Sequence, residues 1–134
     1  MSTAKLLIYF TLVILIISVW TEKLNTVRLL LEAGADVNAQ NEEGYNSLIA
    51  ASQYGYNEIV TRLLSKGANV NMQTEHGLTA LMMAASDGHV KTVQILLEAG
   101  ADINIVTNYG DTALTLARGA KHTKLTRLLL SLSR

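Results

Sequence analysis

The sequence contains no cysteine and no proline, and aromatic residues make up only 5% of its 134 residues. Without cysteine the chain has neither disulfides nor zinc sites with thiolate ligands. Proline, which removes a backbone donor and breaks helices, does not interrupt any segment. Hydrophobic residues make up 49% of the chain and charged residues 16%, a mixture too apolar for a disordered protein. These features predict one packed, helix-rich domain.

Net charge is absent as well, because 11 basic residues balance 11 acidic ones. A neutral chain has no overall field that would draw it to DNA or to an anionic membrane. No aromatic residue follows Tyr109 to stack on a base. The charges are nevertheless separated, since every charged residue after Asp111 is basic: Arg118, Lys121, Lys124, Arg127 and Arg134. We interpret this stretch as the polar end of a terminal unit and expect no nucleic-acid binding.

Patterns that carry catalysis are also missing. The sequence has no G-x-S-x-G, Walker-type or G-x-G-x-x-G motif, and its three histidines are not spaced as metal ligands. The adjacent carboxylates of Glu42 and Glu43 are expected on an exposed loop, where nothing adapts them to acid–base catalysis. We therefore expect no catalytic, cofactor-binding or metal site, no small-molecule substrate and no enzyme activity.

What the sequence does contain is an internal repeat. Two series of glycines recur with a spacing of 33 residues, which indicates a chain built from equal units. The segments around the first series read LLLEAGADVNAQ, LLSKGANVNMQ and LLEAGADINIV, and those around the second read EEGYNSLIAAS, EHGLTALMMAAS and NYGDTALTLAR. The first series is Gly34, Gly67 and Gly100, and the second is Gly44, Gly77 and Gly110.

The residues between the glycines predict two short helices in each unit. Apolar residues fit one face of a helix over residues 81–85, and Asp87–Gly88 ends that helix. Apolar residues recur at helical spacing over residues 90–97, and Gly100 ends this second helix because glycine adopts positive φ without steric strain. The segment from there to Gly110 is expected to be an extended stretch and a turn.

A 33-residue period with G-x-T-A-L near the start and L-L-x-x-G-A-D-V-N near the end resembles the ankyrin repeat, over about residues 22–130. The resemblance implies an all-α solenoid of stacked helix-turn-helix units with hairpin-like loops. We expect a hydrophobic N-terminal segment at 1–21 and a repeat domain at 22–134, comprising a partial repeat at 22–40 and repeats at 41–73, 74–106 and 107–134.

The family's T-P-L-H tetrapeptide is altered in every repeat, because neither its proline nor its histidine is kept. We expect Ile49 and Met82 to replace the hydrogen bonds of that histidine by apolar contacts. His89 and His122 follow the turn between the helices, where the family often has a structural histidine. Lys121 stands at the position of the inter-helix glycine in the last repeat.

Ankyrin repeats are mostly protein-interaction modules, so the resemblance implies binding of a protein through the hairpin tips and the concave face of the first helices. Tyrosine is frequent at binding hot spots, and the carboxylates of this set would steer a basic partner. We therefore expect a partner rich in arginine or lysine. The family's usual contact positions correspond to Glu42, Glu43, Tyr45, Gln53, Tyr54, Glu75, His76, Leu78, Ser86, Asp87, Asn108, Tyr109 and Asp111.

The segment Leu6–Trp20 is apolar at all but two positions, Thr11 and Ser18. It follows Lys5, as the apolar core of a secretory signal would, but no A-x-A cleavage pattern comes after it. One interpretation is a signal or an uncleaved membrane anchor, which predicts a membrane-anchored, secreted or periplasmic protein. The other is a first repeat helix, because Leu15–Ile16 lies 33 residues before Leu48–Ile49. That alternative predicts a cytoplasmic protein, or one that associates with itself or with a larger solenoid through this helix.

Overall fold

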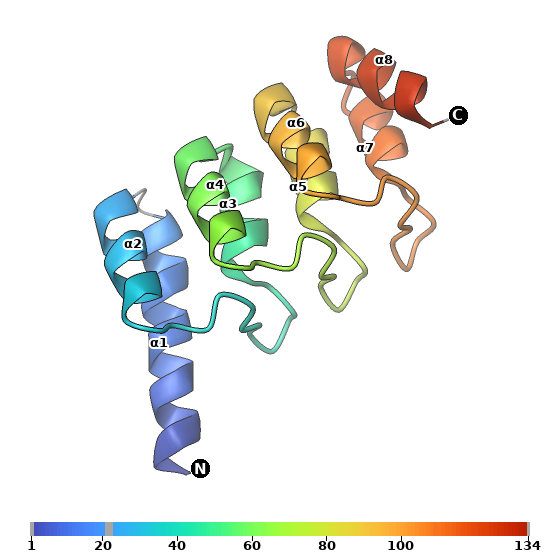
Figure 1. The fold of residues 1–134 in the computed structure, drawn as a ribbon. Helices are drawn as coiled ribbons and strands as arrows, with labels where there is room; N and C mark the ends of the chain where they lie inside the picture. The colour runs from blue at the N-terminus through green and yellow to red at the C-terminus, as the bar shows by residue number, and fades with distance from the viewer. Residues whose placement is uncertain (1, 21–22, 134) are drawn as a thin grey trace.

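The computed structural model describes residues 2–20 and 23–133. Within these residues the regular structure is eight helices that form four antiparallel pairs in one row (Figure 1). The predicted all-α solenoid of repeated helix pairs is confirmed. The helices are α1 (Thr3–Trp20), α2 (Leu24–Glu32), α3 (Ser47–Tyr54), α4 (Asn57–Ser65), α5 (Ala80–Ser86), α6 (Val90–Glu98), α7 (Ala113–Gly119) and α8 (Thr123–Leu132).

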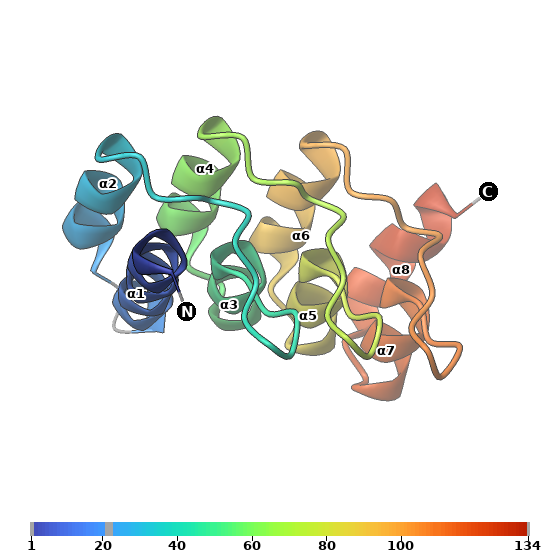
Figure 2. The ribbon, with the colours of Figure 1, turned by 90° about the horizontal axis from the view of Figure 1, so that it is seen from below.

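The pairs make two layers, with α1, α3, α5 and α7 in one and α2, α4, α6 and α8 in the other (Figure 2). We call the first layer the inner helices and the second the outer helices. The core runs between the layers along the whole row, and α3 and α5 are packed on both sides by neighbouring inner helices. Ile49 and Met82 are each only 1% exposed, which confirms that apolar contacts occupy the position of the family's histidine.

A polar side chain begins three of the inner helices. The side-chain oxygens of Asn46 and Thr79 accept hydrogen bonds from the backbone N–H groups three residues later, at 2.9 and 3.2 Å. Thr112 caps α7 in the same way, and the Thr115 hydroxyl accepts a bond from the Thr112 N–H in return. These bonds satisfy backbone donors that the first turn of a helix leaves unpaired.

Histidines join neighbouring repeats at the turn between the two helices. Nε2 of His89 donates to the carbonyl of Gln53 at 2.9 Å, and Nε2 of His122 donates to the carbonyl of Ser86 at 2.9 Å. Gly88 must be glycine here, because a Cβ would lie 2.7 Å from the His122 ring and its φ is +76°. Lys121 adopts the same left-handed conformation, with φ of 64°. In the described chain no histidine packs against Lys121. A side chain is therefore possible at this position, and its only cost is the strain of the positive φ.

Two asparagines join the loops that follow the outer helices. The side chain of Asn71 accepts a bond from the Asp102 N–H at 2.8 Å and donates to the Gly100 carbonyl at 3.4 Å. Asn38 bridges to the next repeat through the equivalent two bonds. Asn104 has the same place one repeat later and is exposed, and its side chain makes no such bond within the described residues. The asparagines therefore hold the row at a constant spacing.

Helix α1 packs against α2 and α3 in the place of a first repeat helix. One of its faces is buried, through Leu12, Leu15, Ile16 and Val19, and Leu15 is as inaccessible as its equivalent Leu48. On another face, Ile14 remains 45% exposed. Within the described residues, no helix combines the length and the apolar character needed to cross a membrane. The expected boundary between residues 21 and 22 lies outside the described residues.

The inter-helix turns provide a test of the backbone strain. We expect Gly88→Ala to lower the free energy of unfolding by at least ~2 kcal/mol, because strain at positive φ adds to the clash with the His122 ring. We expect Lys121→Gly to raise it by about 0.5 kcal/mol, since relief of the strain exceeds the entropy that glycine adds to the unfolded chain. Urea unfolding followed by circular dichroism measures both, and an unchanged midpoint for Gly88→Ala would contradict the geometry.

The asparagine bridges provide a second test with an internal control. We expect Asn71→Ala to lower the free energy of unfolding by about 0.5–1.5 kcal/mol, because it removes the two hydrogen bonds that join this loop to the next repeat. Asn104→Ala removes the same side chain without such a bridge and should change stability by less than about 0.5 kcal/mol. Equal losses in the two variants would show that the bridges contribute nothing.

Candidate protein-interaction surface

Three loops of the same shape project from one side of the row (Figures 1 and 2). We call residues 41–45, 74–78 and 107–111 the hairpin tips. Each tip is closed by a backbone bond from its first N–H to its last carbonyl, at 2.8–2.9 Å, as in Asn41 to Tyr45. The side chain at the first position then accepts bonds from within the tip: Thr107, for example, accepts from Tyr109 and Asp111. The tips are therefore rigid, and they point in one direction.

Hydrogen bonds also connect each tip to the next. The Glu75 N–H donates to the Glu43 carbonyl at 2.9 Å, and the Asn108 N–H donates to the His76 carbonyl at 3.0 Å. Gly44 allows this approach, because a Cβ there would lie 2.8 Å from the backbone of Thr74. The Gln73 side chain donates to the carbonyls of its own tip and of the following loop. These contacts hold the tips in an ordered series, so their side chains are presented at regular intervals.

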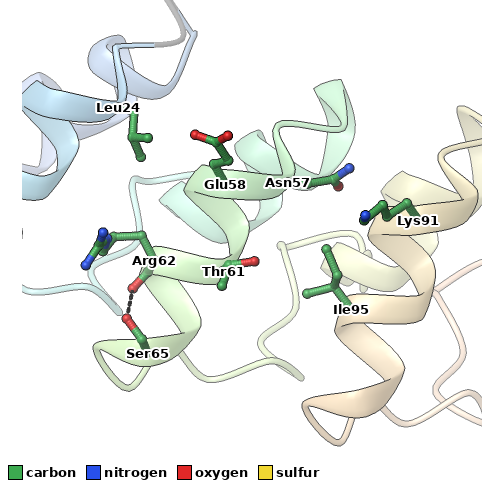
Figure 3. Close-up of a pocket in the computed structure, with 8 residues that line it drawn as sticks. All are labelled: Leu24, Asn57, Glu58, Thr61, Arg62, Ser65, Lys91 and Ile95. Atoms are coloured by element: carbon green, nitrogen blue, oxygen red, sulfur yellow. Dashed lines mark hydrogen bonds between the residues drawn. The ribbon is translucent and has the colours of Figure 1, made fainter.

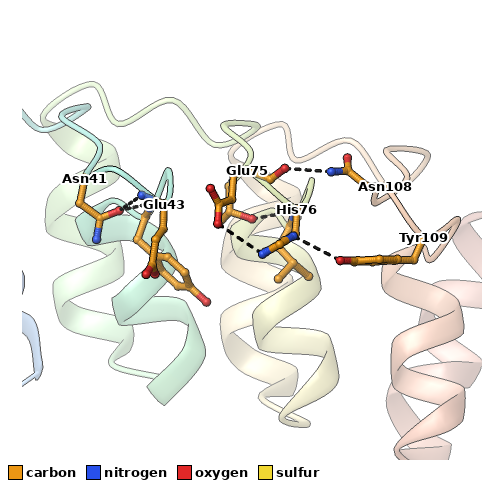
Figure 4. A network of polar contacts seen from close by, with 9 residues as sticks. Asn41, Glu43, Glu75, His76, Asn108 and Tyr109 are labelled. Atoms are coloured by element: carbon orange, nitrogen blue, oxygen red, sulfur yellow. Dashed lines mark hydrogen bonds and ion pairs between the residues drawn. The ribbon is translucent and has the colours of Figure 1, made fainter.

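Predicted contact residues on the second and third hairpin tips interact with one another (Figure 4). His76 Nδ1 lies 3.3 Å from the Tyr109 hydroxyl, and the two rings stack with their centroids 6.1 Å apart. His76 Nε2 lies 3.4 Å from a carboxylate oxygen of Glu75. The side chain of Asn108 donates to the Glu75 carbonyl at 2.8 Å. Tyr109 is nevertheless 75% exposed, so one face of this cluster is open to a partner.

A second group of predicted residues lines a hollow of about 250 Å³ where the first tip meets α3. Its walls are Asn41, Glu43, Tyr45, Gln53 and Tyr54. The Tyr54 ring is held in place by stacking on Tyr56, with centroids 5.6 Å apart. The hollow is smaller than the ~300–1,000 Å³ of typical small-molecule sites, and it combines a carboxylate with two phenol rings. Such a combination suits the end of a single basic side chain.

The remaining predicted residues fall into four places. Glu42 is exposed on the first tip, and Leu78 is half-buried against the core. The Asp111 carboxylate accepts a bond from the Thr115 hydroxyl at 3.3 Å and so belongs to the start of α7. Ser86 and Asp87 lie at the far end of α5, where the Ser86 carbonyl accepts the bond from His122. The structure does not join Ser86 or Asp87 to the tips by any hydrogen bond within the described residues.

A larger hollow of about 680 Å³, open to solvent, lies on the outer helices α2, α4 and α6 (Figure 3). Leu24 and Ile95 contribute apolar surface, and Glu58, Arg62 and Lys91 contribute charges of both signs. Within the described residues, no three metal-ligating side chains come together, here or elsewhere. The mixture of charges gives this hollow no preference for a partner of either sign.

Sequence reasoning missed this outer hollow and the glutamine and asparagine bridges. The bridges had a signal, because Asn38, Asn71 and Asn104 share the 33-residue period. The pairing of His76 with Tyr109 carries the same spacing. The outer hollow has no such signal, since its lining residues belong to three different helices and differ in type.

In a comparison with curated proteins, no protein matches this chain. A family model described as ankyrin repeats (3 copies) matches residues 10–74 and 48–133, which together span most of the sequence. The first match begins inside α1, in agreement with the packing of that helix as part of a repeat. Period, helix pairs, hairpin tips and family model agree, and the chain belongs to the ankyrin-repeat family.

Proposed function

We propose that this chain is an adaptor or scaffold that binds a basic polypeptide segment through its hairpin tips and the hollow beside α3. Ankyrin repeats are generally protein–protein interaction modules, and that general role is the starting point. The observation that supports the basic partner is the hollow itself, which Glu43, Tyr45 and Tyr54 line together. An arginine or lysine head would contact the rings and pair with the carboxylate.

The charges of the neighbouring tips support the same partner. Glu42, Glu43 and Glu75 are exposed on adjacent tips, and the tips carry no lysine or arginine. Carboxylates arranged in this way accelerate the encounter with a basic segment and orient it along the row. Because the tips are joined by hydrogen bonds before any partner arrives, binding does not have to order the loops, which favours affinity.

The proposal is tested with a labelled arginine-rich peptide of about ten residues by fluorescence anisotropy at two salt concentrations. We expect the triple variant Glu42→Gln, Glu43→Gln and Glu75→Gln to weaken binding about tenfold at low salt, because it removes the charge that attracts the peptide. We expect Tyr54→Ala to weaken binding by a similar factor at both salt concentrations, since stacking on the ring depends little on ionic strength.

The matched control removes the same number of carboxylates from the outer helices, through Glu32→Gln, Glu58→Gln and Glu98→Gln. All three side chains are exposed, and they lie on α2, α4 and α6. At the higher, physiological salt concentration the control should retain the affinity of the unmodified chain within about twofold, because long-range attraction alone is screened there. If the control loses as much affinity as the tip variant, the peptide follows overall charge and the tips are not its binding site.

Self-association through α1 is the second candidate, and the exposed apolar side chains of Leu6 and Ile14 favour it. Contact between two such helices would remove this surface from water. We expect light scattering to show a dimer that Leu6→Glu and Ile14→Glu convert to a monomer without loss of helix content. A monomer at the highest concentration tested would exclude this candidate.

We propose no catalytic or cofactor-dependent role, in line with a family that is typically non-enzymatic. Association with a membrane through Leu6–Trp20, and a membrane-anchored or secreted location, stay predictions from the apolar character of that segment. Fractionation of cells that express the tagged chain tests these predictions. Recovery in the membrane fraction would support an anchor, and recovery in the soluble cytosolic fraction would support a cytoplasmic location.

A further inference from the structure

The outward face of the last helix differs from those of the other outer helices in the sign of its charge. Helices α2 and α4 each carry one basic and one acidic residue four positions apart, as Arg28 and Glu32 do in α2. Helix α6 carries Lys91 and Glu98. In α8 the charged residues are Lys124 and Arg127, both exposed and both basic. If the exposed face of the last repeat only had to be soluble, charges of both signs would be equally suitable.

Two further cations lie at the N-terminal end of α8. Lys121 is in the turn between α7 and α8, and Arg118 is in the last turn of α7; both are exposed. We call Arg118, Lys121, Lys124 and Arg127 the basic end. Within the residues that the structure describes, none of the four makes an ion pair. Arg134 lies outside those residues.

Comparison between the repeats of this chain shows how the positive charge is gained. Arg127 replaces Gln94 of the preceding repeat, and Lys121 replaces Gly88. The position of Lys124 is Lys91 in the preceding repeat and Glu58 in the one before that. The helix pair keeps its geometry through these changes, so the fold does not require the cations.

Two of these cations are placed against local preference. Lys121 adopts a left-handed backbone conformation, with φ of 64°, that side chains other than glycine rarely take. Lys124 lies in the first turn of α8, where the helix dipole disfavours positive charge. The equivalent first turn carries Glu58 in α4, which the dipole favours, and Lys91 in α6, so the strain at Lys121 is what sets the last repeat apart. Strain that the fold does not need is characteristic of sites that bind something.

We propose that the basic end binds an acidic, amphipathic polypeptide segment, and that this surface is separate from the hairpin tips. Helix α7 begins at the third tip and ends at the turn that contains Lys121, so the two surfaces lie at opposite ends of the repeat. The chain then has an acidic edge for one partner and a basic end for another. An adaptor that brings two proteins of opposite charge together needs such an arrangement.

An acidic polypeptide fits this surface better than nucleic acid does. Leu130 is 48% exposed on the outward face of α8, one turn after Arg127, and offers an apolar contact beside the charges. Acidic segments with interspersed leucine residues match such a surface. Binding of single-stranded nucleic acid relies on aromatic side chains, and none follows Tyr109 in the sequence.

The test uses the full chain and a labelled synthetic peptide of about 15 residues with glutamate on one helical face and leucine on the other. We expect Lys124→Gln with Arg127→Gln to weaken binding roughly fivefold to tenfold at low salt. The matched control, Arg62→Gln with Lys66→Gln, removes two exposed cations at the end of α4 and should change affinity less than about twofold. Unfolding curves confirm that the variants remain folded. Leu130→Ala should weaken the peptide alone and leave an oligonucleotide of equal charge unaffected.

Equal weakening by both double variants would overturn the proposal, because binding would then follow net charge. Tighter binding of the single-stranded oligonucleotide, lost in the Lys124 and Arg127 variant, would reassign the surface to nucleic acid. Absence of binding to either probe would leave the basic end as a polar cap only, and would also overturn the proposal. The glutamine variant of Glu42, Glu43 and Glu75 should bind the acidic peptide at least as well as the unmodified chain, which separates this test from that of the tips.

Discussion

The contact of each inner helix with the next is the interaction on which the rest of this molecule depends. Helices α3 and α5 have eight and seven residues, too few for a stable helix in isolation. Most of their side chains are buried, and small residues such as Ala51 and Ala84 allow the helices to approach closely. The burial of these short helices between neighbours converts four marginal units into one row.

The binding surfaces follow from that packing. Once the inner helices are in register, the loops between repeats come close enough for Asn71 and Gln73 to bridge them. The middle tip is then held by backbone bonds on both sides, from Glu75 to Glu43 and from Asn108 to His76. A surface built in this way is regular and rigid before a partner is present. It is suited to an extended or helical polypeptide, and the segregated charges of the chain give its two proposed surfaces opposite preferences.

Much of the fold was predictable because each local sequence pattern occurs several times in a repeat protein. The caps at Asn46, Thr79 and Thr112, the glycine turns and the structural histidines all recur at 33 residues. Departures from the pattern were also informative: Lys121 was recognised at a glycine position, and the structure shows its positive φ. The period was enough to predict the glycine turns, the histidines came from the family resemblance, and the caps were seen only in the structure, although they share the same spacing.

The apolar first segment was harder to interpret, because its composition suits a membrane, a signal and a buried helix equally well. Periodicity favoured a repeat helix through Leu15–Ile16, but only the packing of α1 on α3 shows which face is covered. For the candidate site, the sequence predicted which positions lie on the tips but not which of their side chains contact the core. Tyr45 and Leu78 were both expected to face a partner, yet both are partly buried against the core, which depends on side-chain packing between repeats.

Native-state hydrogen exchange tests the central claim most directly, because it measures the stability of each helix separately. If contacts between repeats hold the row together, the backbone amides of Ala51 in α3 and Ala84 in α5 should exchange with the same free energy, equal to that of global unfolding. Exchange of one helix at a much lower free energy, while the other stays protected, would show that the repeats open independently and would contradict the account.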